Sequence, residues 1–258
     1  MTVTFIAHSA YLVEWDKFYT LFDYTYEPDY TGELPELKSG KPLLVFVSHS
    51  HEDHFDAKVF TLLEKYPDTR FFISRDIRLT ERRRQWLNIS DEAFARTTIL
   101  RPDSILLTDA AGEDLSIRAI KSTDIGNAYL LRCEGKMVYH GGDLNWWNWE
   151  SEGKAYCTNM AANYRRAVEK IAAAVRDEAA DAGMPPEITA AMVPLDPRLG
   201  EGAEGMGIEG LLKSVPVRHV FPMHLWKHFE AIDRSRAAHP AEAERIVRIT
   251  ADSERFTI

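Results

Sequence analysis

Residues 43–54 read LLVFV-S-HSHEDH, an apolar run followed at once by three histidines and two acids. Imidazole and carboxylate groups are the ligands that zinc and similar divalent metals prefer. A strand that ends in a loop can turn neighbouring side chains towards one point, so even adjacent residues can converge there. Since three of the nine histidines in the chain lie in this segment, it predicts a metal site built from His49, His51, Asp53 and His54.

The composition is that of a globular protein, with 45 % hydrophobic and 28 % charged residues over 258 positions. A formal net charge of −9 argues against a general affinity for nucleic acid or for an anionic membrane. Cys133 and Cys157 are expected to be reduced thiols. The N-terminus has no charged segment followed by a long apolar one, and no apolar run approaches the ~20 residues of a membrane helix. These features predict a soluble, cytoplasmic protein.

Hydrophobic patterning predicts alternating hairpins and helices rather than a doubly wound parallel fold. Helices are expected after Asp56, which is placed to cap one, and at 80–87 and 158–182. Because the chain has no repeats, low-complexity tracts or linkers, residues 1–258 are expected to form one α/β domain. Strands are expected at 2–7, 11–15, 19–23, 43–47, 70–74, 97–100, 104–108, 115–121, 128–133, 136–140, 190–195 and 217–221.

Two later strand ends offer further metal ligands. One strand runs into Gly141 and Gly142, which permit close backbone approach, and then exposes the carboxylate of Asp143. Another strand leads to the imidazole of His224. Taken singly, Asp143 is typical of a turn and His224 of a loop. Because both follow strands in a chain that already carries the histidine-rich loop, we predict that both join the same metal centre.

With these residues the chain resembles the metallo-β-lactamase superfamily, whose signature His-x-His-x-Asp-His is matched by residues 49–54. The resemblance implies a four-layer αββα sandwich with the metal site along one edge, between the two sheets. It also implies that Asp143 bridges two metals, that His224 is the last ligand, and that the cofactor is one or two zinc ions. The chain is most similar to the branch related to L-ascorbate-6-phosphate lactonase, through His8-Ser9-Ala10, Leu21-Phe22-Asp23, Gly141-Gly142-Asp143 and Pro222-Met223-His224.

One position departs from the superfamily pattern, which supplies a third histidine to the first metal between the signature motif and the bridging Asp. No histidine occurs from residue 55 to residue 139, and the corresponding strand end, residues 122–126, reads STDIG. Three alternatives stay open. Asp124 replaces the histidine and favours a harder metal such as Mn or Fe. In the second alternative the first site is weak, and the centre is built on Asp53, His54, Asp143 and His224. In the third, His8 or His140 substitutes for the missing histidine.

The resemblance implies hydrolytic chemistry at this centre. Two cations bridged by Asp143 would hold a water between them and lower its pKa towards neutrality. The resulting hydroxide would attack an ester, lactone, amide or phosphoester, while Asp53 orients the nucleophile and carries its proton. In the superfamily an Asp at the place of Asp23 supports the ligands through hydrogen bonds, and a turn cap is an equally good interpretation. His8 and His140 are expected in the same supporting layer.

Two loops are candidates for a substrate pocket. Residues 145–149 read NWWNW and follow the bridging Asp directly. Trp147 and Trp149 either line a pocket or pack this loop against the long helix. Asp196 and Arg198 follow another strand, and Arg198 could clamp a carboxylate or phosphate that Asp196 orients. An internal pair of Asp196 and Arg198 without a substrate role is slightly favoured.

The leading functional hypothesis is metal-dependent hydrolysis of a small-molecule substrate. A nuclease is the second hypothesis, because the superfamily includes nucleases, but the charge of −9 and the lack of a basic stripe argue against it. The departure at the third ligand keeps iron-dependent redox chemistry open, and a metal-binding protein without turnover is the fourth hypothesis. Because such folds often pair, we also expect a homo-oligomer, although no residue pattern indicates its interface.

Overall fold

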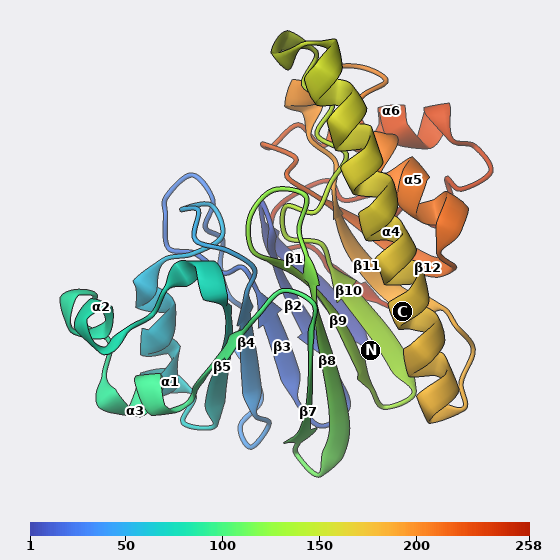
Figure 1. Ribbon diagram of the computed structural model, residues 1–258. Helices are drawn as coiled ribbons and strands as arrows, with labels where there is room; N and C mark the ends of the chain where they lie inside the picture. Colours follow the sequence, from blue (N-terminus) through green and yellow to red (C-terminus); the bar gives the residue numbers. More distant parts are fainter.

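Two β-sheets face each other in the computed structural model, which describes residues 1–258 (Figure 1). The first sheet has the strand order β13-β1-β2-β3-β4-β5-β6. The first and last strands of the chain, β1 and β13, pair antiparallel, so the two termini lie side by side. The strands of this sheet are β1 (Thr2–Ala7), β2 (Ala10–Glu14), β3 (Tyr19–Phe22), β4 (Leu43–Val47), β5 (Thr69–Ser74), β6 (Thr97–Leu100) and β13 (Arg255–Thr257).

The second sheet has the order β12-β11-β10-β9-β8-β7. Strands β7 to β10 form antiparallel hairpins, whereas β10, β11 and β12 run parallel to one another. Crossovers through helices join these three parallel strands. The strands are β7 (Ser104–Ala110), β8 (Glu113–Lys121), β9 (Asn127–Cys133), β10 (Lys136–His140), β11 (Ile188–Pro194) and β12 (Val217–Met223).

Helices cover the outer face of each sheet, which gives four layers in the order αββα (Figure 1). The first sheet carries α1 (Leu62–Lys65), α2 (Glu81–Trp86) and α3 (Asp91–Ala95). The second sheet carries α4 (Lys154–Ala182), α5 (Met206–Ser214) and α6 (Glu230–Ala238). Short 3-10 segments span Ala57–Thr61, Arg75–Ile77, Glu150–Glu152 and Pro197–Leu199. None of the helices combines the length and the apolar character that a bilayer crossing requires.

Strand β4 shows how the sequence produces these layers. All five of its residues are buried, and successive side chains point to opposite faces of the sheet. Leu44 and Phe46 belong to the 50-residue core between the sheets, which extends under α4, α5 and α6. Leu43, Val45 and Val47 belong to a separate core of 21 residues beneath α1 and α3. An apolar run without alternation therefore fits a strand with packed layers on both sides.

The four-layer αββα sandwich that the resemblance implied is confirmed, and some element boundaries differ. Helix α4 begins at Lys154, four residues before the predicted start, because Gly153 (φ 84°) lets the chain turn into the helix there. Asp56 caps a 3-10 turn, accepting a hydrogen bond from the Lys58 amide, and only one turn of α-helix follows. Helices α3, α5 and α6 were not predicted. In α5, Gly207 and Gly210 lower the helix propensity, and packing of Ile208 and Leu211 outweighs it.

Candidate metal centre

The candidate ligands gather at one edge of the sandwich, where parallel strands of both sheets end. In the first sheet, β3 and β4 end next to each other and lead to Asp23 and His49. In the second sheet, β10 and β12 lead to Asp143 and His224, with β11 between them. This common edge brings residues from separate parts of the sequence together, as the resemblance implied. Their ligand atoms form two groups.

The first group, named here the His49 group, contains His49, His51 and Asp143. His49 Nε2 lies 3.0 Å from His51 Nδ1 and 3.4 Å from Asp143 Oδ2. His51 Nδ1 lies 4.0 Å from the same Asp143 oxygen. His49 is fully buried, whereas the His51 side chain is 49 % exposed. The His49 group is therefore open to solvent on the side of His51.

The second group, named here the His54 group, contains His8, Asp53, His54 and His224, whose ligand atoms all lie within 4.8 Å of one another. His54 Nε2 lies 3.0 Å from His224 Nε2 and 3.6 Å from Asp53 Oδ2. His8 Nε2 lies 3.2 Å from Asp53 Oδ2. The three histidines are buried, and the Asp53 side chain is 16 % exposed. This group is therefore largely closed to solvent.

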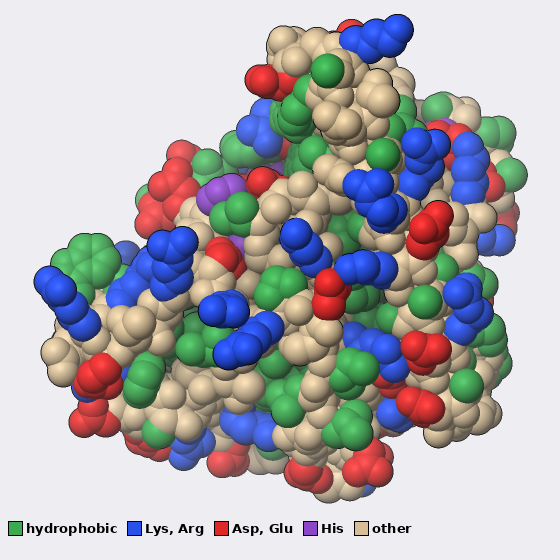
Figure 2. Space-filling model, in the orientation of Figure 1, with side chains coloured by type: hydrophobic (Ala, Val, Ile, Leu, Met, Phe, Trp, Pro, Cys, Tyr) green, Lys and Arg blue, Asp and Glu red, His purple; other side chains and the backbone are tan.

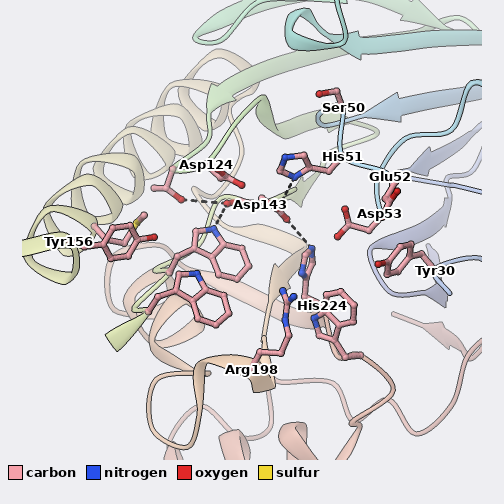
Figure 3. A pocket seen from close by; sticks show the side chains of 15 residues that line it. Tyr30, Ser50, His51, Glu52, Asp53, Asp124, Asp143, Tyr156, Arg198 and His224 are labelled. Atoms are coloured by element: carbon pink, nitrogen blue, oxygen red, sulfur yellow. Dashed lines mark hydrogen bonds and ion pairs between the residues drawn. The ribbon is translucent and has the colours of Figure 1, made fainter. Parts of the chain in front are cut away.

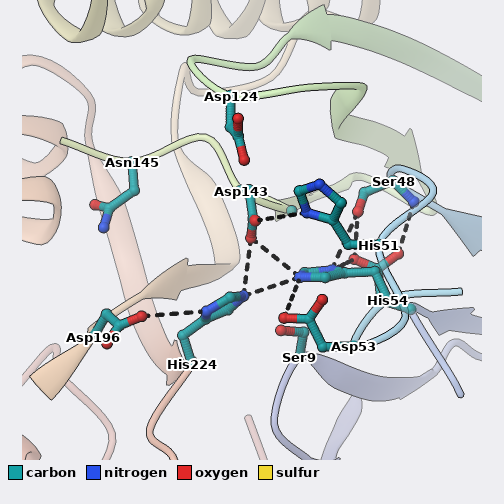
Figure 4. A network of polar contacts seen from close by, with 12 residues as sticks. Ser9, Ser48, His51, Asp53, His54, Asp124, Asp143, Asn145, Asp196 and His224 are labelled. Atoms are coloured by element: carbon teal, nitrogen blue, oxygen red, sulfur yellow. Dashed lines mark hydrogen bonds and ion pairs between the residues drawn. The ribbon is translucent and has the colours of Figure 1, made fainter. Parts of the chain in front are cut away.

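Asp143 lies between the two groups and presents one carboxylate oxygen to each (Figure 4). Its Oδ2 faces His49, and its Oδ1 lies 3.1 Å from His54 Nε2 and 2.9 Å from His224 Nε2. Oδ1 is buried and has no hydrogen-bond partner. A buried carboxylate oxygen without a donor is costly unless a cation neutralises it. The two oxygens are arranged as a bridge between two ions.

The residues of both groups fit divalent cations. Every ligand atom is an imidazole nitrogen or a carboxylate oxygen, the set that zinc, manganese and iron share in proteins. Asp143 Oδ1 faces the Nε2 atoms of His54 and His224 without a hydrogen bond to either, as ligand atoms around one cation do. A cation bound among these atoms would neutralise the Asp143 carboxylate. It would also relieve the close approach of the imidazole nitrogens to one another.

Asp23 determines which ring nitrogen two of these histidines present. Its Oδ2 accepts hydrogen bonds from Ser48 Oγ (2.6 Å) and His54 Nδ1 (2.6 Å), and its Oδ1 accepts one from the Ser48 amide (2.7 Å). Because Ser48 Oγ donates to Asp23, it accepts from His49 Nδ1 at 2.9 Å. We assign the proton of both histidines to Nδ1 from these partners. One buried carboxylate thus aims an Nε2 lone pair of each group at its cation.

The other predicted supporting residues have different positions. His140 Nε2 donates to the Ser9 carbonyl (2.9 Å), and its Nδ1 accepts from the Gly142 amide (3.2 Å). His140 therefore holds the turn before Asp143 and lies outside both groups of ligand atoms, so it does not replace the missing histidine. Asp124 is exposed at the rim of the cavity, also outside both groups. The structure leaves the His49 group with three protein ligand atoms.

The charges at the centre shift the pKa values of the histidines in opposite directions. Burial acts to lower the pKa of His54, but the carboxylates of Asp143 and Asp23 outweigh it and raise that pKa well above its usual value. Against the same effect of burial, Asp143 and Asp196 raise the pKa of His224 to about 9. Burial and the neighbouring His224 lower the pKa of His8 to about 4. In the absence of a cation the centre therefore holds protons, which a metal must displace on binding.

A cavity of about 710 Å³ opens above the two groups (Figure 3). Figure 2 shows histidine side chains at the surface in this hollow, next to acidic ones. Trp147 and Trp149 both line the cavity and stack at 6.2 Å with an interplanar angle of 2°. Trp147 Nε1 donates to the Asp143 carbonyl (2.9 Å), so the aromatic wall is tied to the bridging residue. The loop predicted from NWWNW thus forms part of the cavity.

Asp196 and Arg198 form the internal pair that the sequence favoured, and Arg198 also lines the cavity. Arg198 Nε lies 2.9 and 3.1 Å from the two Asp196 oxygens, and the guanidinium lies 3.9 Å from the centroid of the Trp226 ring. Asp196 is fully buried, and its Oδ2 lies 3.6 Å from His224 Nδ1. The pair therefore connects the cavity wall to a ligand of the His54 group. Arg198 Nη1 has no partner in the protein.

Sequence reasoning missed several residues of this site, among them Ser48, Tyr30 and Trp226. Ser48 links Asp23 to His49, and Tyr30 and Trp226 line the cavity. Ser48 could have been found from its position between the apolar strand and the first histidine. Trp226 follows His224 by two residues. Its side chain reaches the cavity through a left-handed backbone conformation (φ 52°), which no spacing rule predicts. Tyr30 lies in an irregular segment that gave no signal.

No protein-family model matches the chain, and no curated protein sequence is similar enough to match. Solved structures do match over most of its length. Igni18, a metallo hydrolase from Ignicoccus hospitalis, shares 18 % identity at a TM-score of 0.59 and covers 100 % of this chain and 98 % of its own. The Bacillus subtilis protein YhfI, described as a metallo-beta-lactamase fold protein, shares 11 % identity at a TM-score of 0.52, with 99 % and 98 % covered.

A third similar structure is CmlA, a diiron beta-hydroxylase from Streptomyces venezuelae, at 8 % identity and a TM-score of 0.58. It covers 100 % of this chain but only 53 % of its own length. Together with the two sheets and the helices on their outer faces, these likenesses show that the chain has the metallo-β-lactamase fold.

Replacing Asp23 with asparagine is expected to weaken zinc binding by about 10–100-fold. Asparagine keeps one acceptor oxygen and has an NH2 group in place of the other, so it cannot serve both the Ser48 amide and the donors Ser48 Oγ and His54 Nδ1. The hydrogen bonds that fix the His54 tautomer are therefore weakened. The measurement is competition between the metal-free protein and a chromophoric chelator for Zn²⁺. Asp181→Asn, the same substitution on the exposed face of α4, is the control. Equal zinc affinity in the folded Asp23→Asn protein and in the control would show that Asp23 does not orient the ligands.

Proposed function

We propose that the protein is a metal-dependent hydrolase that acts on a small ester, lactone, amide or phosphoester. The observation that carries the proposal is Asp143, whose two oxygens face two separate groups of ligand atoms at the floor of an open cavity. The resemblance to the lactonase-related branch places lactones first among the substrates to test. The fold alone supports no particular reaction, because function depends on the site.

A divalent cation bound here would polarise the electrophile and lower the pKa of a coordinated water. The protein's own contribution begins with Asp53, which lines the cavity. Its Oδ2 lies 3.2 Å from His8 Nε2, while its Oδ1 has no protein partner and can accept a hydrogen bond from a nucleophilic water. Burial acts to raise the pKa of Asp53, but the hydrogen bond from His8 and the charges of His54 and His224 lower it. The carboxylate is therefore ionised and can orient a water through a hydrogen bond.

The cavity walls favour a substrate with a planar, apolar part. Five aromatic side chains line the cavity, and Arg198 is the one arginine or lysine among its lining residues. A planar group fits against the parallel faces of the tryptophan pair. The free Nη1 of Arg198 can donate to a carboxylate or phosphate of the same substrate. The aromatic residues are Tyr30, Trp147, Trp149, Tyr156 and Trp226.

The test is an assay of protein that has been stripped of metal and reloaded with Zn²⁺ or Mn²⁺. The panel contains aryl lactones, aryl esters, amides and aryl phosphodiesters, each with and without a carboxylate on the ring. We expect hydrolysis of at least one class, its loss on chelation and its return with added metal. Absence of hydrolysis across the panel by protein that holds its metal would overturn the proposal. Oxygen consumption by the iron-loaded protein, or salt-dependent RNA binding, would then indicate the redox or the nuclease alternative.

A further inference from the structure

His8 lies far from the histidine-rich loop in sequence, yet its ring belongs to the same cluster. It follows the last residue of β1, and its carbonyl accepts a hydrogen bond from the His224 amide (3.1 Å). Both residues have left-handed backbones, with φ 49° for His8 and φ 62° for His224. Such conformations are costly for residues other than glycine and are found where a side chain must be aimed. Here they place the two rings 4.4 Å apart, centroid to centroid.

The separations within the His54 group match a coordination shell. Four ligands at ~2.0–2.1 Å from a tetrahedral ion lie about 3.3 Å from one another. The observed separations are 3.0 Å from His54 Nε2 to His224 Nε2, 3.2 Å from His8 Nε2 to Asp53 Oδ2, and 3.6 Å from His54 Nε2 to Asp53 Oδ2. Asp143 Oδ1, at 2.9 and 3.1 Å from two of these nitrogens, adds a fifth donor. A cation there would have a shell supplied entirely by the protein.

The His49 group differs in the number of its donors and in its exposure. Only His49 Nε2, His51 Nδ1 and Asp143 Oδ2 converge there. His51 is half exposed and borders the cavity, whereas the histidines of the His54 group are buried. Catalytic metal sites typically have three protein ligands and one open position. Structural metal sites typically have all their ligands supplied by the protein.

We propose that His8 is a metal ligand and that the two cation sites are unequal as a result. The His54 group with Asp143 Oδ1 binds its cation first and tightly. The His49 group binds the second cation more weakly and exchanges it with solvent through the cavity. This inference rests on the metal centre of the proposed function, but it concerns binding alone and needs no substrate.

A different role for His8 would be to donate a hydrogen bond to Asp53 without binding the metal. Glutamine separates the two roles, because its amide nitrogen can replace the donor whereas a neutral amide is a poor zinc ligand. If His8 only positions Asp53, His8→Gln keeps the zinc affinity of the wild type. If His8 is a ligand, His8→Gln loses affinity as His8→Ala does.

The experiment is a titration of metal-free protein with Zn²⁺ in competition with a chromophoric chelator, with folding checked by circular dichroism. In the wild type we expect two classes of sites of different affinity. His8→Ala and His8→Gln should weaken the tight class by about 100-fold or more and leave the weak class nearly unchanged. His51→Ala should remove the weak class and keep the tight one. The control is His228→Ala, since His228 is exposed and pairs with Glu230.

Three results would overturn the inference. One is a wild type with two sites of equal affinity, and another is a His8→Gln protein that binds as tightly as the wild type. The third is loss of the tight class in His51→Ala. Failure of the protein to hydrolyse any substrate would not affect these readouts, so the proposed function and this inference can fail separately.

Discussion

Asp143→Asn is expected to lower the zinc content of the purified protein from about two ions per chain to about one. Hydrolysis of any substrate found in the panel should fall about a thousandfold in kcat/KM, equivalent to about 4 kcal/mol of transition-state stabilisation. The reason is that each Asp143 oxygen faces a different group of ligand atoms. Asparagine keeps one oxygen as a ligand for one group of ligand atoms. Its amide nitrogen, which has no lone pair for a metal, faces the other group.

The measurements are elemental analysis after removal of loosely bound metal and steady-state kinetics on the same preparation. Asp181→Asn on the exposed face of α4 makes the same chemical change away from the centre and should behave as the wild type. A folded Asp143→Asn protein that keeps both ions and its activity would contradict the bridging role of Asp143.

Gly126→Ala is expected to lower the melting temperature by about 6–12 °C and to reduce zinc binding. A Cβ atom on Gly126 would lie 2.2 Å from the Ser48 carbonyl oxygen and 2.5 Å from His49 Cβ, at a backbone φ of +71°. The turn after β8 is thus pressed against the metal loop, and the Asn127 amide bonds to the same Ser48 carbonyl (2.9 Å). Overpacking and the left-handed backbone together cost about 3 kcal/mol, and each kcal/mol is about 2–4 °C in a chain of this size.

Gly135→Ala is the matched control for this variant. Gly135 also has a positive φ (+65°), but nothing lies within 4 Å of its Cβ position. The Gly135→Ala variant should lose only about 1 kcal/mol of unfolding free energy, the cost of the left-handed backbone, and should keep its zinc. Equal melting temperatures and equal zinc contents in the two alanine variants would show that the contact of Gly126 with the metal loop does not matter.

Most strands and the metal loop could be predicted from the sequence because their deciding features are local, whereas the four-layer arrangement was implied by the family resemblance. The apolar run of β4 followed by HSHEDH marks a buried strand that ends at a metal loop, and the structure has both. Asp143 and His224 follow strand ends, and parallel strands bring their ends to one edge. Helices such as α5 were missed because their stability comes from packing of Ile208 and Leu211 rather than from local propensity.

The placement of His8 could not be predicted from the sequence. It depends on one hydrogen bond between the backbones of His8 and His224, which are more than two hundred residues apart. Sequence reasoning left open whether Asp124, His8 or His140 replaces the missing histidine, or whether the first site is weak and has no replacement. His8 belongs to the His54 group, and both ring nitrogens of His140 form hydrogen bonds with backbone atoms. Neither residue therefore completes the His49 group. Long-range backbone contacts of this kind leave no periodicity in a single sequence.

The central claim is that two cations lie on either side of Asp143. Anomalous diffraction at the zinc edge, from crystals of unchelated protein grown with Zn²⁺, tests it most directly. We predict two peaks, one among the ligand atoms of the His54 group and a weaker one between His49, His51 and Asp143. Zinc bound elsewhere on the protein, with neither group occupied, would contradict the claim.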